Sequence, residues 1–276
     1  MSKPFFSIII PTLNEEKYLP KLLEDLSHQT FKDFEVIVVD ARSKDKTVAR
    51  AKSYLNLLPS LHILTSEKRH VCIERNLGAD HAKSDLLIFS DADNRLPSYF
   101  LQGIKYRLES TPCDIAYTWI APEKNTPQYK VIASAINLYY DAEVALLKSP
   151  AGMESMIIVK KDIFYQAGMF DTNINLGEGR YLAQAIEKIG GIPAIFKDPQ
   201  YTYSLRRLQR FGTIRTASAV ARSEILALLS MPSPQKDLFP KLYPMLGGGV
   251  YDQRVKLNKR KLPKFLKNIQ KILREL

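Results

Sequence analysis

LLIFSDADN, residues 86–94, is the stretch that decides the fold. Its first four residues are apolar, which is typical of a strand that is covered on both faces, as in a parallel sheet. The strand then runs into Asp91 and Asp93, one residue apart. Carboxylates are costly to bury without a partner for their charge, so this strand end requires a positive partner.

The residues before this stretch alternate between strand and helix patterns. Short apolar runs at 6–10, 36–40 and 61–64 are each followed by apolar or small residues at helical spacing. With 86–90 they give four strands separated by three helices, the pattern of a doubly wound, mostly parallel α/β sheet. Pro97 stands where we expect the first residue of a fourth helix. The first three helices are expected at 18–26, 47–55 and 72–82.

Polar residues follow three of these strands at their carboxyl ends, which is where ligands bind in such sheets. Three strands that deliver acid or amide groups to one edge predict a ligand site at that edge. The residues concerned are Thr12, Asn14 and Glu15 after the first strand, Asp40 at the end of the second, and Asp91 and Asp93 after the fourth.

The second half of the chain has a mixed pattern. It predicts a strand at 114–119, a helix at 130–147, a strand that enters a helix at 156–164, and a helix at 179–191 that ends at a glycine pair. Beyond residue 212 the pattern is helical and is then broken by prolines and glycines. We therefore expect an α/β domain over 1–212 and a helical extension over 213–276.

The sequence favours a cytoplasmic protein. Cys72 and Cys113 lie far apart without metal-ligand spacing, as in a reduced chain. The apolar run near the start is too short for a signal peptide. No window of about 18 apolar residues lacks charges, so no membrane-spanning helix is expected.

The net charge of +11 is concentrated in residues 254–276, which hold nine Lys or Arg and one acid. This tail therefore carries +8 and leaves +3 for the rest. Its apolar and basic residues fall on separate stripes, as in a helix that lies at an anionic membrane surface. The stripe would equally suit packing on the protein itself or on a second subunit. Nucleic-acid binding is not expected, because the basic residues are not interleaved with aromatic ones.

Five segments form an ordered set along the chain: SIIIPTLNEEKYL (7–19), VVDARSKDKT (38–47), RNLGA (75–79), FSDADN (89–94) and GMFDTNINLGEGRYLAQAIEKIG (168–190). Together they resemble the family 2 glycosyltransferases, which are nucleotide-sugar enzymes with a GT-A fold. The resemblance covers about residues 5–212 and implies a nucleotide-sugar half at 1–95 and an acceptor half at 96–212.

The resemblance implies roles for the residues at the predicted edge. Asp91 and Asp93 match the family's metal-binding DxD motif, which would hold Mg²⁺ or Mn²⁺ at the diphosphate of a nucleoside diphosphate sugar. Asp40 matches an aspartate that accepts a hydrogen bond from the nucleotide base, and Arg75 an arginine that reaches the nucleotide or pyrophosphate. The first nucleotide-binding loop is matched by Pro11, Thr12, Asn14 and Glu15.

Each of these residues also has a purely structural interpretation. Taken alone, the two aspartates after the strand would form a solvated turn. The alternatives are a strand-end cap for Asp40, a helix N-cap for Asn14 and a surface ion pair for Arg75. Ala41 and Arg42 stand where many members of the family have acidic or small residues, which leaves the preferred base and sugar open.

The catalytic base is the open part of the site. In the family, an acid in a Glu-Asp pair that opens a helix takes the proton of the acceptor hydroxyl. Glu178 keeps the first position of this pair, and Gly179 replaces the second acid. The helix dipole alone would also favour a glutamate here. The candidates are therefore Glu178, Asp171 and a group that the sequence does not identify.

The stretch SLRRLQRFG (204–212) resembles a basic segment that follows this helix in related enzymes. Arg206, Arg207 and Arg210 are candidates for contacts with the diphosphate or an anionic acceptor. A solvated basic face is the alternative.

The resemblance thus implies a metal-dependent inverting glycosyltransferase, with a UDP-sugar favoured as donor. The acceptor would be a hydroxyl of a cell-surface glycan or a lipid-linked acceptor, reached at the inner face of the membrane. A catalytically weakened nucleotide-binding protein at the membrane surface remains the alternative because of Gly179. A phosphohydrolase is disfavoured, because its aspartates usually come early in the chain. A nucleotidyltransferase is disfavoured, because no glycine-rich phosphate loop with a lysine follows the first strand.

Overall fold

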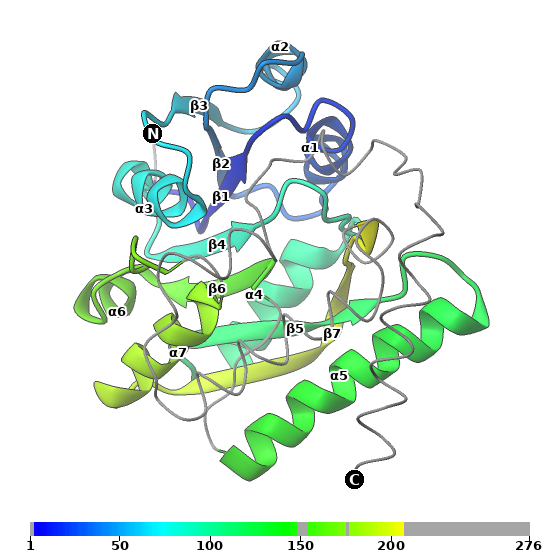
Figure 1. Cartoon of the computed structure of the whole chain (residues 1–276), viewed down its shortest axis with the longest axis vertical. Coiled ribbons are helices and arrows are strands. Elements are labelled where there is room, and N and C mark those ends of the chain that lie inside the picture. Colours follow the sequence, from blue (N-terminus) through cyan, green and yellow to red (C-terminus); the bar gives the residue numbers. More distant parts are fainter. Residues whose placement is uncertain (1–2, 148–153, 175–176, 207–276) are drawn as a thin grey trace, which may run out of the picture.

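The computed structural model describes residues 3–147, 154–174 and 177–206. Within this part the strands are β1 (Phe6–Thr12), β2 (Phe34–Asp40), β3 (Leu61–Thr65), β4 (Leu86–Ser90), β5 (Ile115–Ala121), β6 (Met156–Lys160) and β7 (Pro193–Thr202). They form one sheet in the order β3-β2-β1-β4-β6-β5-β7 (Figure 1). Only β6 runs antiparallel to its neighbours, so the expected mostly parallel α/β sheet is confirmed.

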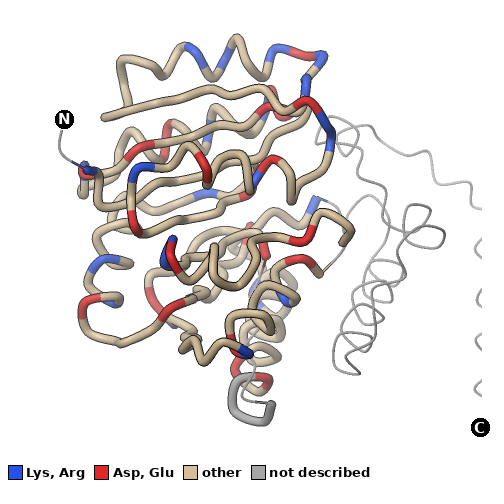
Figure 2. Tube along the Cα trace, turned by 90° about the vertical axis from the view of Figure 1, so that its left-hand side faces the viewer, with Lys and Arg blue, Asp and Glu red and all other residues tan. Residues whose placement is uncertain are grey.

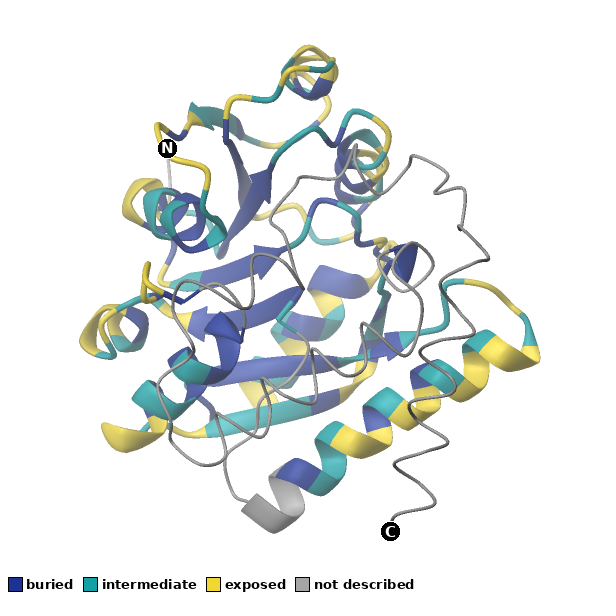
Figure 3. Ribbon diagram, in the orientation of Figure 1, coloured by how far each residue is buried: buried dark blue, intermediate teal, exposed yellow. Residues whose placement is uncertain are grey.

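Helices cover both faces of the sheet and bury one core on each. The helices of the described part are α1 (Leu19–Ser27), α2 (Thr47–Lys52), α3 (Val71–His81), α4 (Phe100–Ser110), α5 (Pro127–Leu147), α6 (Lys161–Gln166) and α7 (Glu178–Lys188). One core joins the sheet to α1, α2, α4 and α5, and the other joins it to α3, α6 and α7. The central strands are therefore buried along their length (Figure 3).

Alternation along the strands distributes the apolar side chains between the two cores. Ile8 and Ile10 of β1 belong to the core under α1 and α4, whereas Ile9 belongs to the core under α3. Gly78 lets α3 approach β1 closely, because a Cβ atom at this position would overlap Cγ2 of Ile9.

The strands and helices expected from the sequence are present, with three differences. The predicted strand-to-helix segment at 156–164 divides into β6 and α6. Pro97 is not the first residue of a helix, because α4 begins three residues later, and the backbone N–H of Phe100 donates to the carbonyl of Pro97. Strand β7 was not expected.

Several sequence predictions lie outside the described residues. They are the boundary near residue 212, the helical extension over 213–276 with its basic tail, and the roles of Arg207 and Arg210. In the described ranges, every helix is too short or too polar to cross a bilayer. Acidic and basic residues are interspersed over the described trace (Figure 2), in keeping with the small net charge before residue 254.

Candidate functional site

Two arginines supply the positive partners that Asp91 and Asp93 require. Nη2 of Arg75 lies 3.1 Å from Oδ1 of Asp91, and Nε of Arg206 lies 2.8 Å from Oδ2 of Asp93. Both aspartates follow β4 at its carboxyl end, as predicted. The two arginines come from opposite halves of the described chain, so long-range packing brings these charges together.

Arg75 is a buried clamp that links Asp91 to the second half of the chain. It lies on α3 and is 1% exposed. Besides Asp91, it donates to Oε1 of Glu178 at 2.9 Å and to the carbonyl of Glu154 at 3.0 Å. Its guanidinium carbon lies 5.2 Å from the ring centre of Phe170. Burial alone would lower the pKa of Arg75, but Glu178 and Asp91 outweigh it and raise the pKa, so the cation is secured.

Arg206 joins the loop after β1 to the loop after β4. Its Nη2 lies 2.5 Å from Oε1 of Glu15, and its guanidinium carbon lies 4.0 Å from the ring centre of Tyr18. Burial raises the pKa of Glu15 to about 8, in spite of the neighbouring guanidinium. Arg206 therefore holds Glu15 and Asp93 in one charged cluster.

The ends of β1 and β2 present buried acceptor atoms side by side. Thr12 and Asp40 are paired in the parallel register of these strands. Oγ1 of Thr12 and Oδ1 of Asp40 are buried and have no hydrogen-bond partner in the protein, whereas Oδ2 of Asp40 accepts from the backbone of Ser43. Buried acceptors normally have a donor, so these two atoms suit a ligand that supplies one. Pro11, in β1, is the residue before Thr12.

Asn14 is not the N-cap of α1, because Tyr18 takes that position. Asn14 instead has a left-handed backbone, with φ of 53°. Its side-chain oxygen accepts from the backbone of Lys44, and its own N–H donates to Oγ of Ser43 at 2.8 Å. Asn14 therefore ties the loop after β1 to the loop after β2, so that the two loops keep one shape.

The start of α7 carries a second carboxylate that sequence reasoning missed. Glu178 is the first residue of α7 and is buried against Arg75. Oε1 of Glu154 accepts from the backbone N–H groups of Gly179 at 3.0 Å and Arg180 at 3.2 Å. The only sequence signal for Glu154 is an acid shortly before a strand. Asp171, the other predicted candidate, lies exposed and binds Asn173.

The carboxylates of Asp91 and Asp93 form a donor set that suits a hard divalent cation. In the described ranges, no group of three His, Cys, Asp or Glu could hold a metal ion by itself. Mg²⁺ needs only one or two carboxylates when phosphate and water oxygens complete its coordination. Oε2 of Glu15, in the same cluster, is a buried oxygen without a hydrogen-bond partner. The residues present therefore fit a cation that arrives together with a diphosphate.

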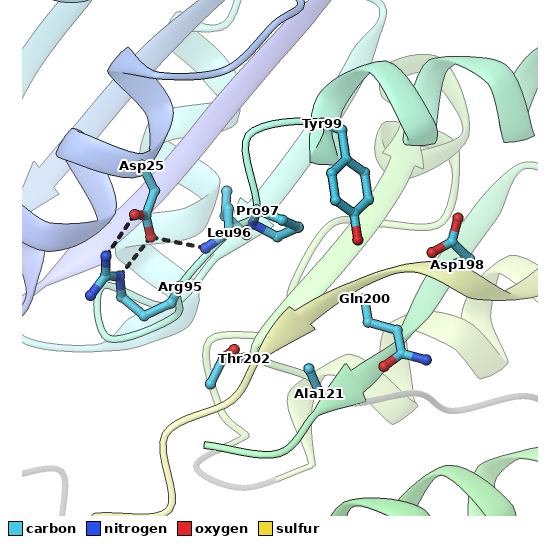
Figure 4. A pocket seen from close by; sticks show the side chains of 9 residues that line it. All are labelled: Asp25, Arg95, Leu96, Pro97, Tyr99, Ala121, Asp198, Gln200 and Thr202. Atoms are coloured by element: carbon cyan, nitrogen blue, oxygen red, sulfur yellow. Dashed lines mark hydrogen bonds and ion pairs between the residues drawn. The ribbon is translucent and has the colours of Figure 1, made fainter. Parts of the chain in front are cut away.

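A separate open cavity of about 520 Å³ lies beside the carboxyl ends of β5 and β7 (Figure 4). Arg95 spans part of its wall through a two-pronged ion pair with Asp25, at 2.6 and 2.7 Å. None of the predicted site residues lines this cavity.

Most of the predicted site residues gather in three groups instead: Arg75 with Asp91 and Glu178, Arg206 with Asp93 and Glu15, and Thr12 with Asp40.

Comparison with known proteins identifies relatives of much of the chain. The family model described as "Glycosyl transferase family 2" matches residues 7–167. An uncharacterized glycosyltransferase of Haemophilus influenzae is 28% identical over 196 residues, which are 70% of this chain and 66% of that protein. The matched stretch is thus slightly less than two thirds of the relative's length.

Solved structures share the fold at low sequence identity. The mannosyltransferase PcManGT of Pyrobaculum calidifontis, in complex with GDP-Man and Mn²⁺, matches with a TM-score of 0.66 and 17% identity. That match covers 89% of this chain and 71% of the other. TarS 1–349 of S. aureus, in complex with UDP, matches with a TM-score of 0.57 and 22% identity, over 83% of this chain and 67% of the other. These likenesses show that the fold is the GT-A type.

Proposed function

Because the chain belongs to glycosyl transferase family 2, we propose that it is a metal-dependent inverting glycosyltransferase. It would move a sugar from a nucleoside diphosphate sugar, with UDP as the favoured nucleotide, to a hydroxyl of a glycan or lipid-linked acceptor. The observation that carries this proposal is the meeting of Thr12, Asp40, Asp91 and Asp93 at the carboxyl ends of neighbouring strands β1, β2 and β4. That edge is where parallel sheets bind ligands.

The donor nucleotide would bind at the ends of β1 and β2. The unpartnered acceptors of Thr12 and Asp40 suit the N–H and O–H groups of a base and ribose. Pro11, Asn14 and Glu15 would shape the loop that closes over the nucleotide. Two structural neighbours were solved with UDP or GDP-Man, which supports a nucleotide sugar as the donor class.

Asp93 and Asp91 would hold Mg²⁺ or Mn²⁺. When bound, the cation neutralises charge on the leaving diphosphate. Arg75 has no exposed donor of its own, so it would act on the donor by fixing the carboxylates of Asp91 and Glu178. Arg206 is buried beside Asp93 and would pair its charge with the diphosphate, as is expected of a basic residue after α7. Arg207 and Arg210 would extend this basic segment.

The acceptor hydroxyl would approach from the start of α7, where a carboxylate takes its proton. Glu178 is the candidate that the sequence provides, and its carboxylate pairs with Arg75 at the start of α7. The basic segment 254–276 would bring the enzyme to an anionic membrane face, where a lipid-linked acceptor resides.

Nucleotide binding tests the donor site directly. UDP and GDP are titrated by calorimetry into the wild type and Asp93→Ala, with Mn²⁺ present or removed by a chelator. The proposal expects binding that requires Mn²⁺ and is lost in the variant. No binding of either nucleotide would refute the donor site. Binding without any consumption of donor sugars would favour the weakened nucleotide-binding protein instead.

A further inference from the structure

The side chain of Glu154 occupies the space that a side chain at position 179 would need. A Cβ atom added to Gly179 would lie 2.8 Å from Cγ of Glu154 and 3.0 Å from Cδ1 of Ile157. Carbon atoms prefer separations of about 3.5–4.0 Å, so both contacts are repulsive. Cγ of Glu154 cannot simply turn away, because the carboxylate beyond it is bound. Positions 154 and 179 thus have room for one side chain between them.

The carboxylate of Glu154 is held at the first turn of α7. Its Oε1 accepts from the N–H groups of Gly179 and Arg180, which in the first turn of a helix bond to groups outside the helix. The helix dipole favours a negative charge at this end. Both backbone bonds end on the same oxygen, so they persist when Oε2 takes a proton.

The main chain around Glu154 is fastened to the rest of the site. The carbonyl of Glu154 accepts from Arg75, and the carbonyl of Ser155 accepts from the backbone N–H of Asp91 at 2.9 Å. Asn94 also donates to the Ser155 carbonyl, at 2.6 Å. The carboxylate of Glu154 therefore projects from a rigid frame that includes the aspartates after β4.

Glu154 is better placed than Glu178 to take a proton from a hydroxyl. Glu178 is 7% exposed, and its Oε1 neutralises the buried cation of Arg75. A proton on Glu178 would remove one of the two carboxylates that compensate that cation, and an uncompensated buried charge is strongly destabilising. Glu154 is half-buried, so a substrate hydroxyl reaches it more easily.

We propose that Glu154 is the general base of the transfer, supplied from the start of β6 in place of an acid at position 179. This inference rests on the proposed function. The acceptor oxygen bonds to the anomeric carbon as the bond from that carbon to the phosphate oxygen breaks. The bonding pair leaves on the nucleoside diphosphate, and the hydroxyl proton moves to Oε2 of Glu154. Arg75 can then keep its ion pairs with Asp91 and Glu178 throughout.

The first test removes the basicity of Glu154 and keeps its shape. In Glu154→Gln the amide oxygen still accepts from the start of α7. We measure release of UDP from UDP-GlcNAc and of GDP from GDP-mannose by the full chain with Mn²⁺, with water as acceptor, and nucleotide affinity by calorimetry. A general base contributes about 10²–10⁴-fold, so release should fall at least about 100-fold while affinity changes less than about threefold. Glu187→Gln, at an exposed position of α7, is the matched control.

The second test moves the carboxylate from position 154 to position 179, on the other side of the space that the two positions share. Glu154→Gly combined with Gly179→Asp should regain at least about tenfold of the release rate lost in Glu154→Gly alone. Gly179→Asp alone should lower Tm, since two side chains then compete for one space, and the added Glu154→Gly should restore it. A merely structural Glu154 predicts no such recovery of rate.

Three results would overturn the inference. Release by Glu154→Gln within about threefold of wild type would exclude it as base. A loss of release that merely follows a tenfold loss of nucleotide affinity would reduce it to a structural residue. A folded double variant with no recovery would contradict the shared space. A wild type that binds neither UDP nor GDP with Mn²⁺ would instead overturn the proposed function, and this inference with it.

Discussion

Replacing Arg206 should make the metal site stronger in the absence of nucleotide. In the structure the guanidinium of Arg206 holds Asp93 at 2.8 Å and Glu15 at 2.5 Å, so a divalent cation and Arg206 compete for the same carboxylate. Arg206→Gln removes the competing charge and leaves the two acids close together. We therefore expect tighter binding of Mn²⁺ alone by this variant.

The size of the effect follows from the bonds that Arg206 makes. A hydrogen bond to a charged group contributes about 1.5–3 kcal/mol, and the cation needs to replace the one at Asp93. Since about 1.4 kcal/mol equals a factor of ten, Mn²⁺ affinity should rise at least about tenfold. Once a diphosphate is present, Arg206 has a new anion to bind. The variant should then bind UDP with Mn²⁺ more weakly than the wild type.

Calorimetric titration of Mn²⁺ into nucleotide-free protein measures the first effect. Arg107→Gln is the control, because it removes the same charge from a half-buried residue whose Nε donates to the carbonyl of Asp198, away from these carboxylates. Equal or weaker Mn²⁺ binding by Arg206→Gln would refute the competition. It would mean that Arg206 positions Asp93 for the metal rather than occupying its place.

Three further changes test the packing around the site. Burial raises the pKa of Glu74 to about 8. The folded protein therefore keeps a proton that the unfolded chain loses above about pH 4.5. As a result, the free energy of unfolding of the wild type falls as the pH rises from 4.5 to 8. Glu74→Gln should gain stability relative to wild type over this range, by at most about 1.4 kcal/mol per pH unit in denaturant titrations, and a constant difference would contradict it. Arg75→Met should cost about 3–5 kcal/mol, because Asp91 and Glu178 lose their buried cation, and a loss below about 1 kcal/mol would show that the clamp is unimportant. Gly78→Ala should cost about 1–3 kcal/mol in the same assay through its overlap with Ile9, whereas an unchanged midpoint would show that α3 moves freely.

Local patterns predicted the first half of the fold well. Strands β1, β2 and β4 are buried on both faces, so most residues along each of them are apolar. Such a short apolar run is typical of a strand in a parallel sheet, which made these strands easy to predict. Strand β7 was missed because Pro193 and Pro199 argue against a strand. Its place at the end of the sheet order explains why these prolines are tolerated there.

The partners within the site could not be read from local patterns. The ends of the strands predicted where Asp91 and Asp93 lie, but not that Arg206 meets Asp93 across 113 residues. Glu154 gave only a weak signal, an acid shortly before a strand, because its place beside Gly179 depends on how the start of β6 packs against α7, 25 residues further along the chain. The exclusion of one side chain by another is a property of three-dimensional packing, and periodicity does not record it.

The clamp at Arg75 limits how members of this family can be recombined. Because Arg75 bonds Asp91 in one half of the described chain and Glu178 and the Glu154 carbonyl in the other, a chimera with a crossover between them inherits an arginine from one parent and its anions from another. Parents that differ at these positions would yield hybrids in which a buried charge has no partner of opposite sign. Donor and acceptor specificities are therefore best exchanged by grafting surface loops around the clamp, with Arg75 and its partners inherited as one unit.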